Sequence, residues 1–428
     1  MEDFKMKLGK KLMAVATIAL AGLTMAACGG GNTASSSGSG SYKGQNLKIG
    51  VWIGSDQEKQ GMNDLIKGFE KKTGARVTEK VYTDFNTQIQ ADLAGHKAPD
   101  VWYMDSAMYP FFQKQGVLQP LDSKTVKTSN FYPALIKAFS TNGKVYGAPK
   151  DTSTLALYVN NDMLKKTNTN INDVPKTYED MIKWLPSFQA KLDTAYGKGK
   201  VHAMAYNQDM ARNLYIMERN GGQPITKSGK ANLASDQVVK NLDLYKQLVA
   251  TGAAVTPKEI GQGDNGTAFG AGKVAMMEEG NWTYPVQKKQ YKTNFTVLPM
   301  LSWEGKQGGM IFTVGWGEYA QSKVKPLANE WIKYVSSVAT MKKYIETTGT
   351  LPSRPDVATD AKLDDNASLK VHLDANKYST VWQAGTTLTT INTSYQNFVG
   401  KGLTGKTPLK SALESADKQA NAAIDKAK

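Results

Sequence analysis

The sequence contains almost none of the residues from which metal centres and disulfides are built. Among its 428 residues there is one Cys, Cys28, and there are three His: His96, His202 and His372. Zinc and iron–sulfur sites need several nitrogen or sulfur ligands, and a disulfide needs two thiols. The sequence therefore excludes an intrachain disulfide, and we expect neither a bound metal nor another cofactor.

The apolar run near the start is too short to span a membrane. Residues 5–11 hold four Lys, and the following uncharged stretch, 12–27, has about 16 residues against the roughly 20 that a spanning helix needs. A basic segment followed by such a run is typical of a cleaved signal peptide. The order Met25-Ala26-Ala27-Cys28-Gly29 resembles the lipobox of bacterial lipoproteins, so we expect residues 1–27 to be removed and Cys28 to be lipidated.

Negative charge is under-represented along the chain. There are 53 Lys and Arg against 38 Asp and Glu, a net charge of +15, and removal of residues 1–27 with their four Lys and two acidic residues leaves +13. A basic protein is drawn toward anionic polymers and lipids. The Lys are scattered and no motif of a nucleic-acid-binding domain occurs, so we expect no nucleic-acid partner. Residues 28–45 are rich in Gly and Ser, which predicts a flexible tether between the lipid and a folded body.

From residue 46 the pattern predicts strands that alternate with helices. Extended runs at 47–53, 76–82 and 99–105 are separated by segments with apolar residues at helical spacing, 62–69 and 85–93. This alternation indicates βαβ units and a mostly parallel sheet, with ligands at the carboxyl ends of the strands. Four residues lie at such ends: Trp52, Ser55, Asp56 and Asp105.

The rest of the chain predicts a second lobe. Residues 143–158 are expected to cross to it, a further α/β layer follows over 177–249, and the extended segments 294–300 and 310–320 indicate a return to the first lobe. A polar amphipathic helix is predicted at 408–427. We therefore expect the chain to be divided as follows: a first lobe of 46–150 plus about 298–347, and a second of 151–297 plus about 348–428.

Three sequence patterns resemble enzyme sites, but each lacks a feature that the corresponding chemistry requires. Residues 266–274 approach a phosphate-binding loop, but Val274 has no hydroxyl to hold magnesium. Residues 315–320 fit a dinucleotide motif, but a bulky Trp would crowd the pyrophosphate. Glu278 and Glu279 stand beside Trp282 as in a glycosidase, yet sequence neighbours do not flank a bond, so we expect both to end a strand and face solvent.

Trp and carboxylate residues recur where elements end. Sugars present apolar faces that stack on indole and hydroxyls that need polar partners, so this distribution suits a carbohydrate. Trp102 and Trp331 lie inside apolar runs and are assigned to the core. The residues that remain are Trp52, Asp56, Asp105, Asp151, Trp282 and Trp316.

Several segments, taken together in order and spacing, resemble the extracellular solute-binding proteins of bacterial sugar ABC transporters, the group that includes the maltose-binding protein. They are 98–105, 146–151, 157–160, 268–276, 279–282, 297–299, 315–317 and 351–354. The resemblance implies a two-lobed α/β fold of the type II periplasmic-binding-protein kind, each lobe a mostly parallel sheet flanked by helices. It implies no catalysis: the lobes close on a ligand, which is delivered to membrane permease subunits.

The resemblance also implies site residues. On the first lobe these are Asp56 or Gln57, Asp105, and Gly315 with Trp316; Asp151 is placed at the hinge, and Trp282 and Arg354 on the second lobe, with Tyr158 and Asn213 as further candidates. Trp282 and Trp316 would stack on sugar rings, and Asp105, Asp151 and Arg354 would bind hydroxyls. Residues 356–400 resemble nothing specific, which leaves contacts from Trp382 or Tyr395 open.

The expected protein is thus a lipid-anchored monomer on the outer face of the cytoplasmic membrane, in an envelope of Gram-positive type. Its ligand would be a neutral oligosaccharide, a maltodextrin or another, because several carboxylates would repel an anion. Two alternatives are a glycan-active hydrolase at the cell surface and an adhesin that binds envelope polymers through its basic surface.

Overall fold

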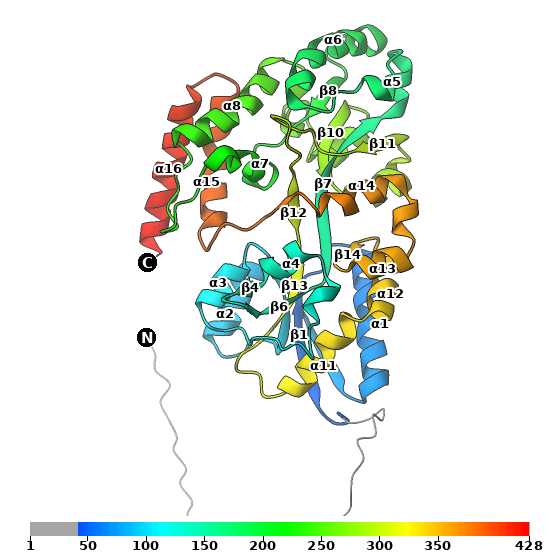
Figure 1. Cartoon of the computed structure of the whole chain (residues 1–428), viewed down its shortest axis with the longest axis vertical. Helices are drawn as coiled ribbons and strands as arrows, with labels where there is room; N and C mark the ends of the chain where they lie inside the picture. The colour runs from blue at the N-terminus through cyan, green and yellow to red at the C-terminus, as the bar shows by residue number, and fades with distance from the viewer. Residues whose placement is uncertain (1–41, 428) are drawn as a thin grey trace, which may run out of the picture. The chain divides into compact units, whose positions relative to one another are not determined.

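The computed structural model describes residues 42–427, which lie in a single unit (Figure 1). The expected signal peptide, Cys28 and nearly all of the tether lie outside the described residues. Within 42–427 no helix combines the length and the apolar character needed to cross a bilayer.

The first lobe is built on a five-stranded sheet. Its strands, in spatial order, are β2 (Arg76–Val81), β1 (Asn46–Val51), β3 (Val101–Asp105), β13 (Val314–Glu318) and β6 (Gly147–Pro149). The first three are parallel, whereas β13 is antiparallel to both neighbours. Because β13 enters from the second lobe, Val314 lies opposite Asp105 and Glu318 opposite Val101.

Helix α1 (Asp56–Thr73) shows why the predicted alternation appears. The Ser55 side chain accepts a hydrogen bond from the Glu58 amide at 3.1 Å and so caps the helix. Gly74 ends it with φ of 70°, a conformation that costs glycine little. The face between them, with Met62 and Phe69, is buried. The other helices of this lobe are α2 (Phe85–Ala94), α3 (Tyr109–Lys114), α4 (Pro133–Ala138), α11 (Lys325–Val335), α12 (Val338–Thr348) and α13 (Pro355–Asp360).

The second lobe is built on an eight-stranded sheet around the long strand β7 (Asp151–Asn160), which Figure 1 shows running up from the first lobe. Four strands pair antiparallel with β7: β10 (Val274–Gly280), β11 (Phe295–Leu298), β12 (Met310–Phe312) and β14 (Leu351–Pro352). The remaining pairs are parallel and add β8 (His202–Ala205), β9 (Ala254–Val255) and β15 (Thr380–Val381). Both sheets are therefore mixed, not mostly parallel as expected, because strands that cross between the lobes enter them from the opposite direction.

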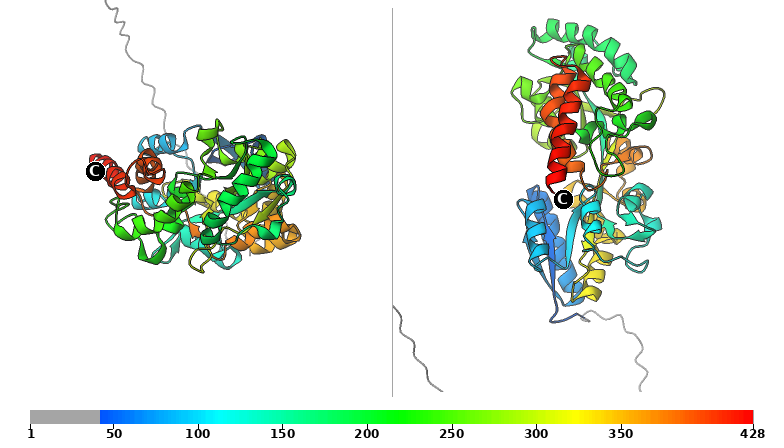
Figure 2. Two further views of the ribbon diagram at one scale, coloured as in Figure 1. Left: turned by 90° about the horizontal axis from the view of Figure 1, so that it is seen from above. Right: turned by 90° about the vertical axis from the view of Figure 1, so that its left-hand side faces the viewer.

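Helices cover this larger sheet. They are α5 (Asn161–Lys166), α6 (Tyr178–Tyr196), α7 (Met210–Met217), α8 (Asp236–Ala250), α9 (Asn265–Gly270), α10 (Thr283–Val286), α14 (Ala367–Ala375), α15 (Leu388–Leu403) and α16 (Leu409–Lys426). Helices α15 and α16 pack side by side along one flank of the lobe (Figure 2). The predicted tail helix thus joins the second lobe, whose core takes in Leu413 and Ile424.

The chain crosses between the sheets at neighbouring positions that are joined by hydrogen bonds. The Lys150 amide donates to the Val314 carbonyl at 2.7 Å, and the Thr313 hydroxyl donates to the Asp151 carbonyl at 2.8 Å. The predicted strand 310–320 is divided at Thr313, since 310–312 pairs in the larger sheet and 314–318 in the smaller. The limits proposed for the two lobes stay a prediction.

Candidate functional site

A cleft of about 630 Å³ lies between side chains of the two lobes. This volume is within the range of about 300–1,000 Å³ found for small-molecule sites. The first lobe contributes Trp52, Tyr82, Thr83, Asp84, Phe85, Asn86, Asp105, Ala107 and Met108, and the second contributes Trp382, Thr389 and Asn392.

The first-lobe wall is formed where parallel strands end. Trp52 follows β1, Asp84 follows β2, and Asp105 is the last residue of β3. The Trp52 ring is held edge-to-face by Phe85, with centroids 4.8 Å apart, and by Tyr103 at 5.1 Å. Such packing restrains the indole before any ligand arrives, which lowers the entropy cost of stacking on it.

Asp105 supplies a shielded carboxylate to this wall. Burial raises its pKa to about 6, although the Ala107 amide, which donates to Oδ1 at 2.7 Å, opposes the rise. At neutral pH the group is therefore mostly ionised and offers only acceptor oxygens. A hydroxyl of a bound ligand would suit it as a donor.

The second-lobe wall comes from the segment after β15 and from α15. Trp382 is held in place by its amide, which donates to the Ile311 carbonyl at 2.8 Å. Thr389 and Asn392 are three residues apart on α15 and so share a face. Asn392 Oδ1 accepts the Met210 amide at 2.8 Å, which ties α15 to the start of α7.

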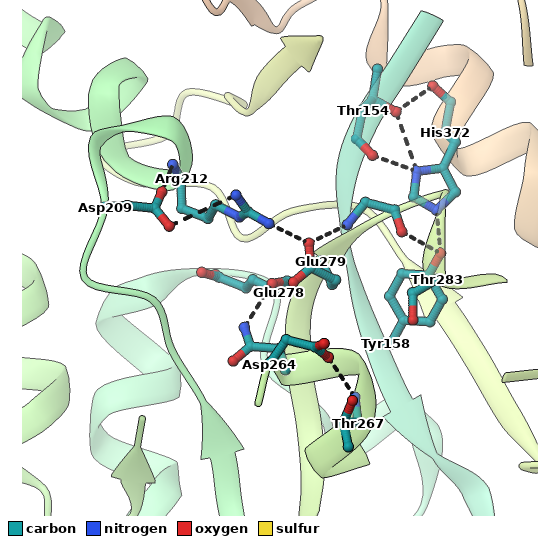
Figure 3. A network of polar contacts seen from close by, with 12 residues as sticks. Thr154, Tyr158, Asp209, Arg212, Asp264, Thr267, Glu278, Glu279, Thr283 and His372 are labelled. Atoms are coloured by element: carbon teal, nitrogen blue, oxygen red, sulfur yellow. Dashed lines mark hydrogen bonds and ion pairs between the residues drawn. The ribbon is translucent and has the colours of Figure 1, made fainter. Parts of the chain in front are cut away.

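Arg212 of α7, two residues beyond Met210, belongs to a charged cluster with Asp209 and Glu279 (Figure 3). Arg212 donates to Glu279 Oε1 at 2.8 Å and lies 3.7 Å from Asp209. Burial lowers its pKa, but Glu279 and Asp209 raise it, and the result is above the ordinary value. The guanidinium lies 5.4 Å from the Trp282 ring, a cation–π contact, and Trp282 remains 41% exposed.

Of the predicted site residues, the structure places one, Asp105, in the lining of this cleft. Trp282 is exposed beside Arg212. Asp151 lies at the crossing, where it pairs with Lys150 at 2.6 Å and accepts the Val314 amide at 3.1 Å. Asp56, like Gln57, is exposed in the first turn of α1, after Trp52, and neither is among the described residues that line the cleft.

Trp316 is not the exposed platform that we expected. It is 1% exposed, 4.5 Å from the Tyr103 ring and 5.5 Å from the Trp331 ring, in the core of the first lobe. Its neighbour Gly315 faces Phe139, where an added Cβ would come within 3.0 Å. Both residues sit in the middle of β13, between β3 and β6, so neighbouring side chains cover them. Trp102 and Trp331, by contrast, are confirmed as core residues.

Arg354 also serves structure. Its Nη1 donates to the Ser336 carbonyl at 2.8 Å, its Nη2 is 2.5 Å from Asp356, and the group stacks over Phe131 of the first lobe. Its donors are therefore engaged in the first lobe and not in the second as expected, and its role in ligand binding stays a prediction.

Tyr158 and Asn213 are fully buried in the second lobe. The Tyr158 hydroxyl is 2.8 Å from His372 Nε2, and the Asn213 amide donates to the Tyr395 hydroxyl at 3.2 Å. The open question about Tyr395 is answered in the same way, since it has no exposed surface.

Glu278 and Glu279 do not face solvent, contrary to expectation. They are 3% and 4% exposed. Glu278 accepts hydrogen bonds from Tyr178 at 2.5 Å and Tyr245 at 3.1 Å, and burial raises its pKa to about 7, against the effect of these hydroxyls. Partners of this kind reduce the cost of burying a carboxyl group.

Several residues that line the cleft were not among the predicted ligand contacts. Trp52 lies at a strand end, and Asp84 and Asn86 follow β2 in the same way. The rule that ligands lie beyond the carboxyl ends of parallel strands points to all three. Trp382 and Asn392 carry no such signal, because their segment reaches the cleft only through long-range packing.

The sequence is similar to curated sugar-binding proteins of bacteria. It is 26% identical over 432 residues to a galactooligosaccharide-binding protein of Bacillus subtilis, covering 98% of each chain. It is 25% identical to a diacetylchitobiose-binding protein of Streptomyces coelicolor, covering 84% of this chain and 85% of the other. It is also 26% identical to a maltodextrin-binding protein of Bacillus subtilis, covering 81% and 82%.

Solved structures share the fold. An ABC substrate-binding protein of Listeria monocytogenes, in complex with cycloalternan, matches with a TM-score of 0.74 at 19% identity, over 89% of this chain and 99% of that one. The sugar-binding protein MalE of Xanthomonas citri matches with a TM-score of 0.76 at 17% identity, over 90% and 98%. The predicted two-lobed fold of the type II kind is confirmed.

A family model described as "Bacterial extracellular solute-binding protein" matches residues 64–371, well over half of the chain. Its members bind solutes outside the cytoplasm and are not enzymes, so the alternative of a surface hydrolase is removed. The chain belongs to the bacterial extracellular solute-binding proteins.

Proposed function

We propose that this protein captures a neutral oligosaccharide in the cleft between its lobes. The observation that carries the proposal is the presence of Trp52 and Trp382 on opposite lobes of one cleft, with Asp84 and Asp105 beside them. Two indoles offer faces for sugar rings, and the carboxylates offer acceptors for hydroxyls. Relatives that bind galactooligosaccharides, diacetylchitobiose and maltodextrin support the same ligand class.

The cluster of Arg212, Glu279 and Trp282 would extend the site toward the crossing strands. Arg212 is a fixed donor and Glu279 a fixed acceptor, and Trp282, which is exposed, adds a third indole ring. An ion pair that is already formed can bind hydroxyls without a further loss of side-chain freedom. Asp151 would contribute from the hinge.

Ligand capture would proceed by closure of the lobes. A ligand that contacts both Trp52 and Trp382 binds the closed arrangement more tightly than the open one, and only this difference in affinity can shift the population toward closure. Closure also removes water from around Asp105, which strengthens its polar contacts. The closed protein would then deliver the sugar to permease subunits of an ABC importer.

The expected cellular setting completes the proposal. Lipidation of Cys28 would hold the protein, as a monomer, on the outer face of the cytoplasmic membrane, and the tether of about 18 residues, 28–45, would let the body diffuse near the permease. Mass spectrometry of the chain from its native host tests this directly: a diacylglyceryl group on Cys28 as the first residue is expected, and an intact residue 1 contradicts it.

The test of function is a titration of the purified protein with neutral di- to hexasaccharides, in which binding is measured by tryptophan fluorescence and by calorimetry. Saturable binding of one sugar class with a fluorescence change is expected, because two of the lining residues are Trp. Chromatography of the mixture should show the sugar unaltered. Absence of binding to every sugar in the panel would overturn the proposal.

A further inference from the structure

Two adjoining cavities lie on the second lobe, outside the cleft. They have volumes of about 360 and 460 Å³ and share Glu259 and Thr404 in their linings. They are bounded by the short helix Pro257–Ile260 and by the turn that joins α15 to α16. We call them together the lysine groove, because four Lys line them: Lys258, Lys401 and Lys406 in the first, and Lys246 in the second.

The positive charge of this groove is largely uncompensated. Among residues 42–427, no carboxylate lies within ion-pair distance of Lys258, Lys401 or Lys406, while Lys246 lies 3.8 Å from Asp243. Glu259 is the one acidic side chain among the described lining residues. Its Oε2 accepts the Thr256 amide at 2.7 Å and the Thr256 hydroxyl at 2.9 Å, so this oxygen already serves the local turn.

Helix α15 borders both the cleft and the groove. Asn392 lines the cleft, and Gln396 and Gly400, four and eight residues further along α15, line the groove. Residues at this spacing share a helix face. The neutral amides of Gln208, Gln396 and Asn397 line the same cavity as three of the Lys, and amide groups offer hydrogen-bond donors beside these charges.

We propose that the lysine groove binds an anionic chain that carries several phosphate groups. Lysine ammonium groups act as separate point charges on flexible stems, in contrast to the fork with which Arg grips a single phosphate. Here they are spread over two adjoining cavities, which suits repeated negative charges along a chain. The site is independent of the sugar cleft, so it would hold the protein to a polyanion without occupying the binding site for solute.

The test measures binding of fluorescently labelled inorganic polyphosphate to the full chain. In the variant Lys258→Ala/Lys401→Ala/Lys406→Ala, affinity should fall about tenfold, with a shallower dependence on salt concentration. The matched control is Lys67→Ala/Lys114→Ala/Lys127→Ala, three exposed Lys of the first lobe, which removes the same charge. The control should change affinity by less than about twofold, since distant surface charges are screened.

Each of three further outcomes would overturn the proposal that the ligand is an anionic chain. Equal losses in the two triple variants would mean that net charge alone accounts for binding. Competition by inorganic phosphate as strong as that by polyphosphate, at equal phosphate concentration, would indicate a site for one anion. Capture by phosphatidylglycerol vesicles without polyphosphate binding would indicate a lipid headgroup. The triple Lys→Arg variant should retain binding, and thermal unfolding of every variant should match that of the parent.

Discussion

The side-chain amide of Gln383 donates a hydrogen bond to the main-chain carbonyl of Ser106 at 2.8 Å. The same nitrogen reaches the Ala138 carbonyl at 2.7 Å, and the Ser106 hydroxyl returns a bond to the Trp382 carbonyl at 3.1 Å. The residue after one cleft Trp is therefore tied to the residue after Asp105. Through these contacts, the placement of Trp382 depends on the first lobe.

Substitution Gln383→Ala should weaken sugar binding about tenfold, because Trp382 loses the bonds that orient its segment, each worth about 1 kcal/mol. Calorimetric titration of the sugar identified by the panel measures this. Gln247→Ala is the control, since Gln247 is an exposed glutamine of α8 whose amide donates within that helix, to Asp243 at 2.8 Å. Unchanged affinity for Gln383→Ala would contradict the positioning role.

Substitutions Trp52→Ala and Trp382→Ala should each raise the dissociation constant about 30-fold, as expected when a central aromatic contact of about 2 kcal/mol is lost. Tryptophan fluorescence and calorimetry are the readouts. Trp184→Ala serves as control, since Trp184 stacks on Phe188 in α6 at 4.4 Å, away from the cleft. Near-parental affinity in both cleft variants would remove these residues from the site.

Substitution Trp316→Ala should act on stability. Truncation of a buried Trp costs about 3–5 kcal/mol of the free energy of unfolding, through lost burial and the cavity that remains. Denaturant unfolding measures the loss. Trp282→Ala gives the comparison, because that side chain is 41% exposed, so its truncation should lower the free energy of unfolding far less. Similar unfolding midpoints for the two variants would contradict the contrast in burial.

His372 should make the protein sensitive to acid. Burial lowers its pKa to about 4, although the Thr154 carbonyl, which accepts from Nδ1 at 2.9 Å, opposes the shift. Between pH 6.5 and 4 the unfolded chain then binds more protons than the folded one, so this residue lowers stability as pH falls. Between pH 7 and 4 the free energy of unfolding of the neutral variant His372→Gln should fall by about 2–3 kcal/mol less than that of the parent, as measured by denaturant unfolding. Parallel pH profiles would contradict the assignment.

Glu318 should have the opposite effect. It has no exposed surface, and neither carboxylate oxygen has a hydrogen-bond partner among the described residues. Burial raises its pKa to about 7, although Lys325 opposes the rise. The folded chain holds the proton more tightly, so stability from this group is lost as pH rises from 4.5 to 7.

Substitution Glu318→Gln removes that charge. It should stabilise the protein at pH 8 by about 1–2 kcal/mol and have little effect at pH 4.5, where the parent is also neutral. Thermal unfolding at the two pH values gives the measurement. A variant that is destabilised at pH 8 would show that Glu318 has an ionic partner in solution.

The local sequence pattern was sufficient to predict the strands and helices of the first lobe up to β3. The predicted extended runs 47–53 and 99–105 and the predicted helical segment 62–69 correspond to strand 46–51, strand 101–105 and helix 56–73, because apolar spacing acts over a few residues. The position of Asp105 at a ligand-facing edge followed as well, because parallel strands end together. The crossing at Thr313 could not be predicted, since both sides of it are extended and apolar.

The sequence by itself determined the alternation of strands and helices, the scarcity of metal ligands, the basic charge and the family. These properties depend on residue type and on spacing along the chain. Tertiary structure alone decided which Trp is available to a ligand: Trp316 and Trp282 look alike in the sequence, but one is enclosed between strands and the other lies at a loop. It also brought Trp382 opposite Trp52. Burial depends on neighbours that are distant in the chain, and no local pattern encodes them.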